Sequence, residues 1–308
     1  MRKIKVAVIG VGHLGIRHAQ IYQNLKNAQL VGICDINPRR LKEVCQQLKV
    51  KGYTSYRKLF PYVEAVSIAV PAQQHYEIAK DFLKQRIHVL VEKPFVLSLK
   101  DANNLIKLSQ KNKLILQVGH IERFNPAFNA TLKLIKDVRY IECDRLSPFS
   151  GRGLDVGVVM DLMIHDIDII VGLVKAKLQR IEAIGTNVLT EKEDIANARL
   201  YFKNGCICNL TASRISEETV RKIRIFLKDA YISLDYRNRE AFIYKKINST
   251  IQKKAIPIEK KEPLKKEISS FLNCILYKRK PLVCAETAKE ALIVALKIQR
   301  KIWRKNKF

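Results

Sequence analysis

The amino-acid sequence predicts an α/β protein in which a doubly wound parallel sheet is followed by an α+β domain with an open, mainly antiparallel sheet. A short apolar strand, Lys5–Ile9, ends in a glycine-rich turn and leads into a helical segment. Apolar strands and helical segments then alternate up to about residue 120, which is typical of a parallel sheet. After Arg139 the segments alternate polar and apolar residues, which is typical of half-exposed antiparallel strands.

The first predicted domain spans residues 1–120. After the first strand we expect, in chain order, the helix Ile16–Leu25, the strand Leu30–Cys34, the helix Leu41–Leu48, the short connection Tyr53–Tyr56, the strand Ala65–Val70, the helix Gln74–Gln85, the strand Val89–Val91, the helix Leu99–Lys111 and the strand Leu114–Val118. The segment Gly119–Pro126 then opens a further helix.

The second predicted domain spans residues 121–308. It contains a buried helix within Val156–Val174 and the strands Tyr140–Arg145, Ile181–Val188, Asp194–Tyr201, Cys206–Ser213, Arg221–Phe226 and Ala230–Tyr236. Asn204-Gly205 predicts a hairpin turn, and Lys245–Lys266 a hairpin and loop. The closing helices are Leu264–Tyr277 and Ala285–Trp303, and we expect the last helix to pack back near the first domain.

The composition is that of a soluble globular protein, with 47% hydrophobic and 28% charged residues in a chain of 308, long enough for two domains. No apolar run is long enough to span a bilayer or to serve as a signal peptide, so we expect a cytoplasmic protein without an integral membrane segment. The seven cysteines are odd in number and include no Cys-x-x-Cys, which predicts reduced thiols and no metal site.

The net charge of +28 is compatible with nucleic acid, an anionic membrane or a phosphorylated substrate. Lysine and arginine are spread along the whole chain without a nucleic-acid-binding motif, so we expect no nucleic-acid partner. The basic segment Lys297–Lys307 could touch a membrane surface, but cations at a helix end also complement the helix dipole, and we prefer that interpretation.

The glycine-rich turn has the spacing of a dinucleotide-binding fingerprint. Gly10 allows the tight turn, Gly12 lets a pyrophosphate approach the backbone, and Gly15 lets the helix pack closely on the strand. The pyrophosphate then binds at the helix N-terminus, beside His13 and Leu14, where free N–H groups favour an anion. The turn therefore predicts a dinucleotide cofactor.

Asp35 ends the second strand, 20 residues after Gly15. A carboxylate there accepts hydrogen bonds from both ribose hydroxyls and repels a 2′-phosphate, which favours NAD over NADP. Arg39 and Arg40 could meet a 2′-phosphate, or could be solvated at the start of the helix after Pro38. We predict NAD as the cofactor and place Arg40 in its site.

In a doubly wound sheet, ligands bind at the carboxyl ends of the strands. Residues at or just beyond such ends are Val70, Pro71, His75, Glu92, Lys93, His120 and Arg123, of which the first five are predicted to bind the cofactor. Lys93 lies between a strand end and a proline, where it can stabilise a developing alkoxide or act as a base if burial lowers its pKa. The alternative is a surface lysine paired with Glu92.

The buried helix carries Asp161, His165 and Asp168 on one face, at spacings i, i+4 and i+7, whereas Asp166 points elsewhere. A carboxylate one turn from an imidazole can bind one ring nitrogen and leave the other to take a proton. A core histidine satisfied by a neighbouring aspartate is the alternative.

The glycine fingerprint, Glu92-Lys93-Pro94 and Asp161-x-x-x-His165-x-x-Asp168, in this order, resemble the glucose–fructose oxidoreductase / inositol dehydrogenase (Gfo/Idh/MocA) family over essentially the whole chain. The resemblance implies a Rossmann domain and a C-terminal domain that binds substrate and forms a homo-oligomer, a dimer or a tetramer. It implies hydride transfer between the nicotinamide and a sugar or cyclitol carbon. Lys93 and His165 would be the catalytic pair, and Asp161 would orient His165 or contact the substrate.

A finer resemblance concerns the branch that oxidises the 3-hydroxyl of UDP-N-acetylglucosamine, in which an aminotransferase converts the 3-keto product to a 3-amino sugar for lipid A. The stretches that carry it are Val118–Pro126, Arg145–Phe149 with Gly151–Gly153, Asp194–Ala198 and Asn209–Arg214. It implies a nucleotide-sugar substrate bound by His120, Arg123, Asn125, Arg152, Asp161 and His165. The diphosphate needs cations, for which Arg123, Arg145, Arg152 and Arg214 stand in loop or strand-end positions, although each could be a solvated arginine. Many relatives carry glycines just before the helix, whereas this chain has Asp155-Val-Gly-Val-Val159, so the approach to the substrate could differ.

Other functions stay open on the sequence alone. The substrate could be inositol, a free sugar or a UDP-linked uronic acid. The chain could be a non-catalytic cofactor-binding regulator, although Lys93, Asp161 and His165 together argue against that. A basic nucleic-acid or membrane binder would show binding that falls steeply with salt.

Overall fold

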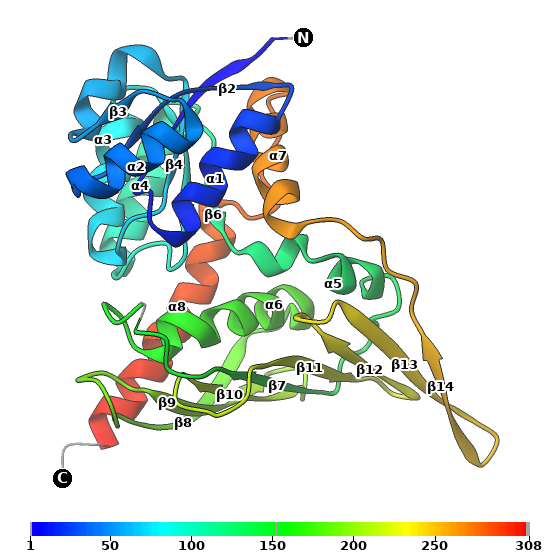
Figure 1. Cartoon of the computed structure of the whole chain (residues 1–308). Coiled ribbons are helices and arrows are strands. Elements are labelled where there is room, and N and C mark those ends of the chain that lie inside the picture. Colours follow the sequence, from blue (N-terminus) through cyan, green and yellow to red (C-terminus); the bar gives the residue numbers. More distant parts are fainter. Residues whose placement is uncertain (1, 152, 306–308) are drawn as a thin grey trace. The chain divides into compact units, whose positions relative to one another are not determined.

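The computed structural model describes residues 2–151 and 153–305 (Figure 1). Contacts divide the chain into two compact units, of which the first comprises Met1–His120 and Leu264–Lys289 and the second Ile121–Pro263 and Glu290–Phe308. The first break follows His120, where the sequence analysis places the domain boundary. The segment Leu264–Lys289, which the sequence analysis assigns to the second domain, belongs to the first unit.

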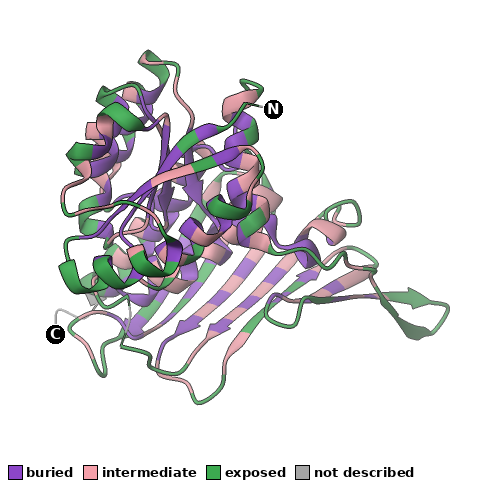
Figure 2. Cartoon of the chain, turned by 45° about the horizontal axis from the view of Figure 1, so that its top comes forward, coloured by how far each residue is buried: buried purple, intermediate pink, exposed green. Residues whose placement is uncertain are grey.

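The first unit is built on a six-stranded parallel sheet. Its strands lie in the order β3 (Gly52–Tyr53), β2 (Ala28–Cys34), β1 (Ile4–Ile9), β4 (Ala65–Ile68), β5 (His88–Glu92) and β6 (Leu116–Gly119). Every residue of β4 and all but one of β1 are buried (Figure 2), as expected where helices cover both faces of a parallel sheet. The predicted doubly wound sheet is confirmed.

Four helices follow strands of this sheet: α1 (His13–Asn24), α2 (Pro38–Leu48), α3 (His75–Lys84) and α4 (Leu99–Lys111). Two short 3₁₀ segments, η1 (Tyr56–Tyr62) and η2 (Ala72–Gln74), lie between them. Helix α2 begins at Pro38, earlier than predicted, because the side chain of Asn37 accepts hydrogen bonds from the first free amides. The predicted connection Tyr53–Tyr56 is instead the end of β3 and the start of η1.

The first unit is completed by α7 (Pro263–Leu276) and the segment after it. Phe271 is fully buried, and the amide of Val118 in the edge strand β6 donates to the carbonyl of Val283 at 3.1 Å. This pairing satisfies an edge strand, which explains why a late segment returns to the first unit. Helix α8 (Ala285–Lys305) begins there and continues into the second unit. Neither α8 nor any other described helix has the length and apolarity needed to cross a membrane.

The second unit contains an eight-stranded sheet. Its strands lie in the order β14 (Thr250–Ala255), β13 (Glu240–Ile247), β12 (Ala230–Asp235), β11 (Val220–Phe226), β7 (Tyr140–Leu146), β10 (Ile207–Ser213), β9 (Ile195–Phe202) and β8 (Leu178–Thr186). Strands β7 and β10 run parallel, and the other neighbouring pairs are antiparallel. The predicted open, mainly antiparallel sheet is confirmed.

Buried and less buried residues alternate along most of these strands (Figure 2), because one face of the sheet is covered, whereas β14 is exposed throughout. The covering elements are η3 (Ile121–Phe124), α5 (Pro126–Thr131), a wide π-helical turn η4 (Val159–Met163) and α6 (Ile164–Val174) (Figure 1). The opposite face carries a row of aromatic rings, Tyr140, Phe226, Tyr231 and Tyr244, whose successive centroids are 5.5, 5.2 and 4.2 Å apart.

Helix α7 also carries a carboxyl group into the core of the first unit. Glu267 is fully buried, and neither of its side-chain oxygens has a hydrogen-bond partner in the described part of the chain. Burial, and then the nearby charge of Glu92, raises the pKa of Glu267 well above its ordinary value. The folded protein therefore keeps this group protonated at a pH where the unfolded chain ionises it.

We predict that Glu267→Gln raises the melting temperature at pH 8. Because the pKa of Glu267 is higher in the folded protein than in the unfolded chain, Glu267 does not reduce stability below about pH 4. As the pH rises, the unfolded chain ionises this group first, and the free energy of unfolding falls. The amide does not titrate, so its advantage should shrink on acidification. Melting curves at pH 4.5 and pH 8 test this, with the exposed Glu290→Gln as control. An equal shift at both pH values would contradict it.

Candidate active site

The glycine-rich turn of the first unit leaves the start of α1 open to a ligand. Gly10 has a φ of +83°, and a Cβ there would lie 2.5 Å from the carbonyl oxygen of Ala69. A Cβ on Gly15 would lie 1.8 Å from the carbonyl oxygen of Gly10, whereas a Cβ on Gly12 would meet nothing within 4 Å. Gly12 precedes α1, which begins with His13 and Leu14 and has no side-chain cap. Free backbone amides at this open position suit a pyrophosphate.

The carboxylate of Asp35 connects the glycine-rich turn to the end of β2 through hydrogen bonds. Its Oδ2 accepts a hydrogen bond from the amide of Val11 at 2.9 Å, and its Oδ1 accepts one from the amide of Asn37 at 2.8 Å. A guanidinium nitrogen of Arg40 lies 3.8 Å from Oδ2. Asp35, which is predicted to bind the ribose, therefore also shapes the glycine-rich turn.

We predict that Asp35→Ala weakens NAD binding and relaxes discrimination against NADP, because the carboxylate no longer repels a 2′-phosphate beside Arg40. Asp35→Asn keeps an oxygen that can accept from one amide, so it should relax discrimination with a smaller loss of NAD affinity. The ratio of the Kd values for NAD and NADP measures the effect. An unchanged ratio in both variants would show that Asp35 does not read the ribose.

His75 joins the ends of two strands in the first unit. Its Nδ1 lies 2.8 Å from the carbonyl oxygen of Pro94 and its Nε2 lies 3.0 Å from that of Val70. The ring is 1% exposed, and burial lowers the pKa of His75, although the two carbonyl acceptors oppose this. The histidine thus connects the segments that carry Pro71 and Lys93, and we interpret it as a positioning residue.

The side chain of Glu92, next to Lys93, is buried in the first unit. Its Oε1 is 3.0 Å from Nε2 of the buried His18, and its Oε2 accepts a hydrogen bond from the amide of Lys93 at 3.3 Å. A Cβ added to Gly119 would lie 2.8 Å from the Glu92 carboxyl group. The carboxylate is therefore packed beneath the backbone of Lys93, and a role for Glu92 in holding this segment accounts for its burial.

We predict that His75→Ala lowers kcat on the order of tenfold to a hundredfold, because small displacements of a reacting group have effects of that size. The matched control is His88→Asn. The Nδ1 of His88 accepts from the amide of Ile115 at the other end of β5, and asparagine can keep that acceptor. Steady-state kinetics and NAD affinity are the measurements. An unchanged kcat in His75→Ala, or an equal loss in the control, would contradict the positioning role.

In the second unit, Asp161 lies in the π-helical turn and His165 in the first turn of α6. The wide turn departs from the 3.6-residue period on which the predicted common face of Asp161, His165 and Asp168 rests. Arg123 Nε donates to Asp168 at 2.7 Å, so the structure gives Asp168 a partner of its own. Asp166 likewise binds Arg145.

Three arginines that the sequence analysis considered for the diphosphate have internal partners. Arg123 binds Asp168, as described above. Arg145 is buried and donates to Asp166 at 2.8 and 2.9 Å and to Glu122 at 3.1 Å. These ion pairs account for both side chains without a substrate.

Arg214, the third of them, holds the loop in front of the π-helical turn. Its guanidinium donates to the carbonyls of Gly153 and Val156 at 3.2 and 2.7 Å and lies 3.5 Å from Asp194. Gly153 has a φ of +66°, and a Cβ there would lie 3.0 Å from Oδ2 of Asp161. The loop therefore packs against Asp161. The signal in the sequence for this packing is the pair of glycines, Gly151 and Gly153, before the helix.

The remaining predicted substrate residues have different surroundings. Asn125 caps α5 by accepting from the amide of Ala127 and donates to Glu122 and to the carbonyl of Tyr236, so its hydrogen-bonding groups are used internally. His120 is buried at the end of the first segment of the first unit. Arg152 lies outside the described residues.

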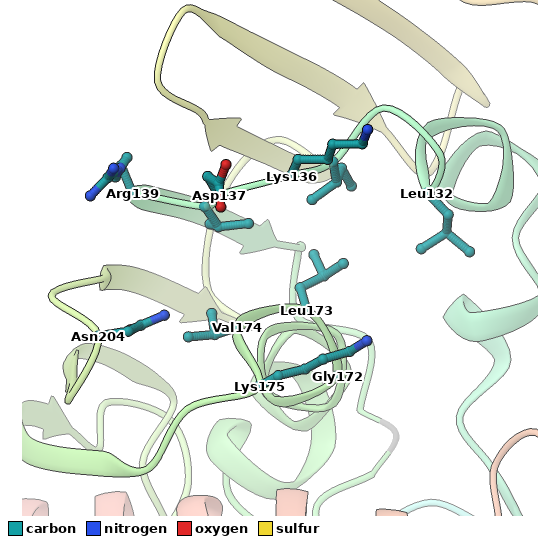
Figure 3. A pocket seen from close by; sticks show the side chains of 11 residues that line it. Leu132, Lys136, Asp137, Arg139, Gly172, Leu173, Val174, Lys175 and Asn204 are labelled. Carbon is teal, nitrogen blue, oxygen red and sulfur yellow. The ribbon is translucent and has the colours of Figure 1, made fainter.

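A hollow of about 440 Å³ lies at the C-terminal end of α6 (Figure 3). Lys136, Arg139 and Lys175 line it, but Arg139 extends away from the two lysines, so the three cations do not converge on one anion. We therefore do not interpret it as the active site. The described residues include no cluster of side chains suited to a metal ion.

Two regions of the chain match known domain families. Residues 4–120 match the NAD-binding Rossmann-fold domain of the Gfo/Idh/MocA oxidoreductases, and residues 137–233 match the C-terminal domain of the same family. The chain belongs to the Gfo/Idh/MocA family. This Gfo/Idh/MocA protein is an NAD-binding oxidoreductase, and the family predicted from the three motifs is confirmed.

This chain is 38% identical over 307 residues to UDP-N-acetylglucosamine 3-dehydrogenase from Acidithiobacillus ferrooxidans, with 97% of each chain covered. A solved structure of that enzyme matches with a TM-score of 0.92 at 37% identity, over 98% of each chain. Myo-inositol 2-dehydrogenase from Thermotoga maritima is 29% identical over 230 residues, covering 68% of this chain and 69% of that protein. The predicted class, a dehydrogenase acting on CH–OH groups with NAD as cofactor, is confirmed.

Proposed function

We propose that this dehydrogenase oxidises the 3-hydroxyl of UDP-N-acetylglucosamine to a 3-keto sugar. The observation that carries the proposal is the 38% identity, over nearly the whole chain, to an enzyme named for that reaction. Lys93, Asp161 and His165 are all present, as the family motifs require. The packing of Gly153 against Asp161 adds support, because it holds a loop of the UDP-sugar branch beside a proposed catalytic residue.

In the proposed mechanism, His165 accepts the proton of the 3-hydroxyl. Asp161 orients the imidazole so that one ring nitrogen is available as a base. Lys93 donates a hydrogen bond to the oxygen on which negative charge develops, and is the second candidate for the base. NAD, when bound, supplies the acceptor for the hydride that leaves the same carbon. The substrate thus loses one proton and one hydride.

The fit of the first unit to NAD rests on the cradle formed by Gly10, Gly12 and Gly15. The open start of α1 offers amides to the pyrophosphate, and Asp35 offers a carboxylate to the ribose. His75 and Glu92 hold the backbone that carries Lys93. These residues bind and position, and none of them needs to change its protonation state during turnover.

We further propose that an aminotransferase consumes the 3-keto product in the synthesis of 3-amino sugars for lipid A. A ketone is a substrate for transamination, and its removal would drive an unfavourable oxidation forward. We also propose a homo-oligomer formed through the open face of the eight-stranded sheet. The aromatic row of Tyr140, Phe226, Tyr231 and Tyr244 on that face supports this, because aromatic rings are enriched at such interfaces.

An inositol or another sugar is the second candidate substrate. It is favoured by the likeness to myo-inositol 2-dehydrogenase, which is weaker in identity and covers about two thirds of the chain. The absorbance of NADH distinguishes the two when purified protein and NAD are mixed with each substrate and a ketone trap. NADH formed with the UDP sugar alone supports the proposal. NADH formed with inositol alone would replace the proposed substrate by inositol. If no polyol yields NADH although NAD binds, a non-catalytic regulator would be favoured.

We predict that His165→Ala reduces turnover by about 10² to 10⁴-fold, as expected for loss of a general base, and leaves NAD affinity nearly unchanged. Stopped-flow or steady-state NADH formation gives the first quantity, and fluorescence titration with NAD the second. Loss of NAD binding together with turnover would contradict the assigned role.

A further inference from the structure

The diphosphate of a nucleotide sugar needs cations, and in the described part of the second unit Arg221 and Arg237 form a pair that no ion pair with a carboxylate neutralises. Arg123, Arg145 and Arg214 bind internal carboxylates and carbonyls. Arg221 at the start of β11 differs from them. Its side chain is exposed, and none of the described carboxylates forms an ion pair with it.

The register of the sheet places Arg221 beside the buried ion-pair network. Arg221 on β11 lies directly opposite Arg145 on β7 in the antiparallel pairing. Directly paired residues point to the same face, so both side chains project from the face on which α6 lies, as do the buried Ile223 and Ile225. Arg145 in turn binds Asp166, the residue after His165. Arg221 is therefore one strand away from the cation that anchors the first turn of α6.

The charges around Arg221 favour an anion. Glu122 and Asp166 are the nearby carboxylates, and both already bind Arg145. Arg237 adds a second exposed guanidinium, which is steadied by donating to the carbonyl of Thr219 at 3.1 Å. Partial removal from water, and then the charge of Arg145, lowers the pKa of Arg221. The Asp235 carboxylate accepts from the backbone amide of Arg237 at 2.9 Å, but among the described residues no carboxylate forms an ion pair with the guanidinium group of Arg221 or of Arg237.

We propose that Arg221, assisted by Arg237, binds the diphosphate of the nucleotide-sugar substrate. A guanidinium group can donate two parallel hydrogen bonds to phosphate oxygens, which a lysine cannot do with the same geometry. The diphosphate is attached at C1 of the sugar ring and the reacting hydroxyl at C3, so the two groups need separate partners. We expect the hydroxyl to bind at His165 and the diphosphate at the arginine pair beside the Arg145–Asp166 ion pair. The inference rests on the proposed function and assigns the residues that select a nucleotide sugar over a free sugar.

The test compares Arg221→Gln with a matched control, Arg224→Gln. Arg224 is on the same strand but on the opposite face, where it binds Glu142 at 3.1 Å. We expect Arg221→Gln to raise the KM for UDP-N-acetylglucosamine on the order of tenfold to a hundredfold, as for loss of hydrogen bonds to a charged group. The inhibition constant for UDP should rise by the same factor, and the affinity for NAD should not change. The KM of Arg221→Lys should lie between the values for the wild type and Arg221→Gln. Arg224→Gln should have the KM of the wild type.

The outcomes separate the two proposals. A wild-type protein that neither oxidises the UDP sugar nor binds UDP removes the proposed function, and this inference with it. A wild-type protein that does both, together with an Arg221→Gln variant of unchanged KM and unchanged UDP inhibition, overturns the inference alone. Melting curves and NAD titration of each variant show whether it is folded, and Arg221→Lys provides the comparison if the glutamine variant is not.

Discussion

A buried guanidinium group holds the first turn of α6 on the sheet of the second unit. Arg145 on β7 donates to Asp166 through two hydrogen bonds and to Glu122 through a third, so one cation connects the sheet, α6 and η3. Burial alone would lower the pKa of Arg145, but the neighbouring acidic groups, with Asp166 first and Glu122 next, together outweigh burial and raise it. Breaking a buried ion pair costs about 3–5 kcal/mol because the remaining charge is left uncompensated. The position of His165, next to Asp166, depends on this interaction.

The same network explains why the sequence alone does not give the partners of these arginines. An arginine at the end of a strand has the same local sequence signal whether it meets a substrate or a carboxylate from a distant segment. Arg123 and Arg145 meet aspartates that lie 45 and 21 residues further along the chain. Only the packing of α6 on the sheet brings these charges together. Lys93 and the glycines of the cofactor turn are easier to predict, because their positions follow from a single strand end.

In the fold, too, features set by neighbouring residues could be predicted from the sequence, whereas features set by contacts between distant segments could not. The parallel sheet, the glycine-rich turn and helix Leu99–Lys111 could be predicted because apolar periodicity and turn residues act over short distances. The return of Leu264–Lys289 to the first unit could not, since it depends on the unpaired edge of β6. The π-helical turn Val159–Met163 was also missed, because one widened turn leaves the apolar pattern of the helix nearly unchanged.

The eight-stranded sheet ends in two edge strands, β14 and β8, and this gives the high net charge a physical use. Every residue of β14 is exposed, and the strand carries Lys253 and Lys254. At the other edge, Arg180 on β8 is exposed but pairs with Glu182 at 3.2 Å, so the unpaired charge lies mainly along β14. Edge strands can pair with the edges of other copies, and cations placed along them oppose such pairing by mutual repulsion. The cations of β14 and the net charge of +28 therefore both oppose edge-to-edge pairing between copies of this chain.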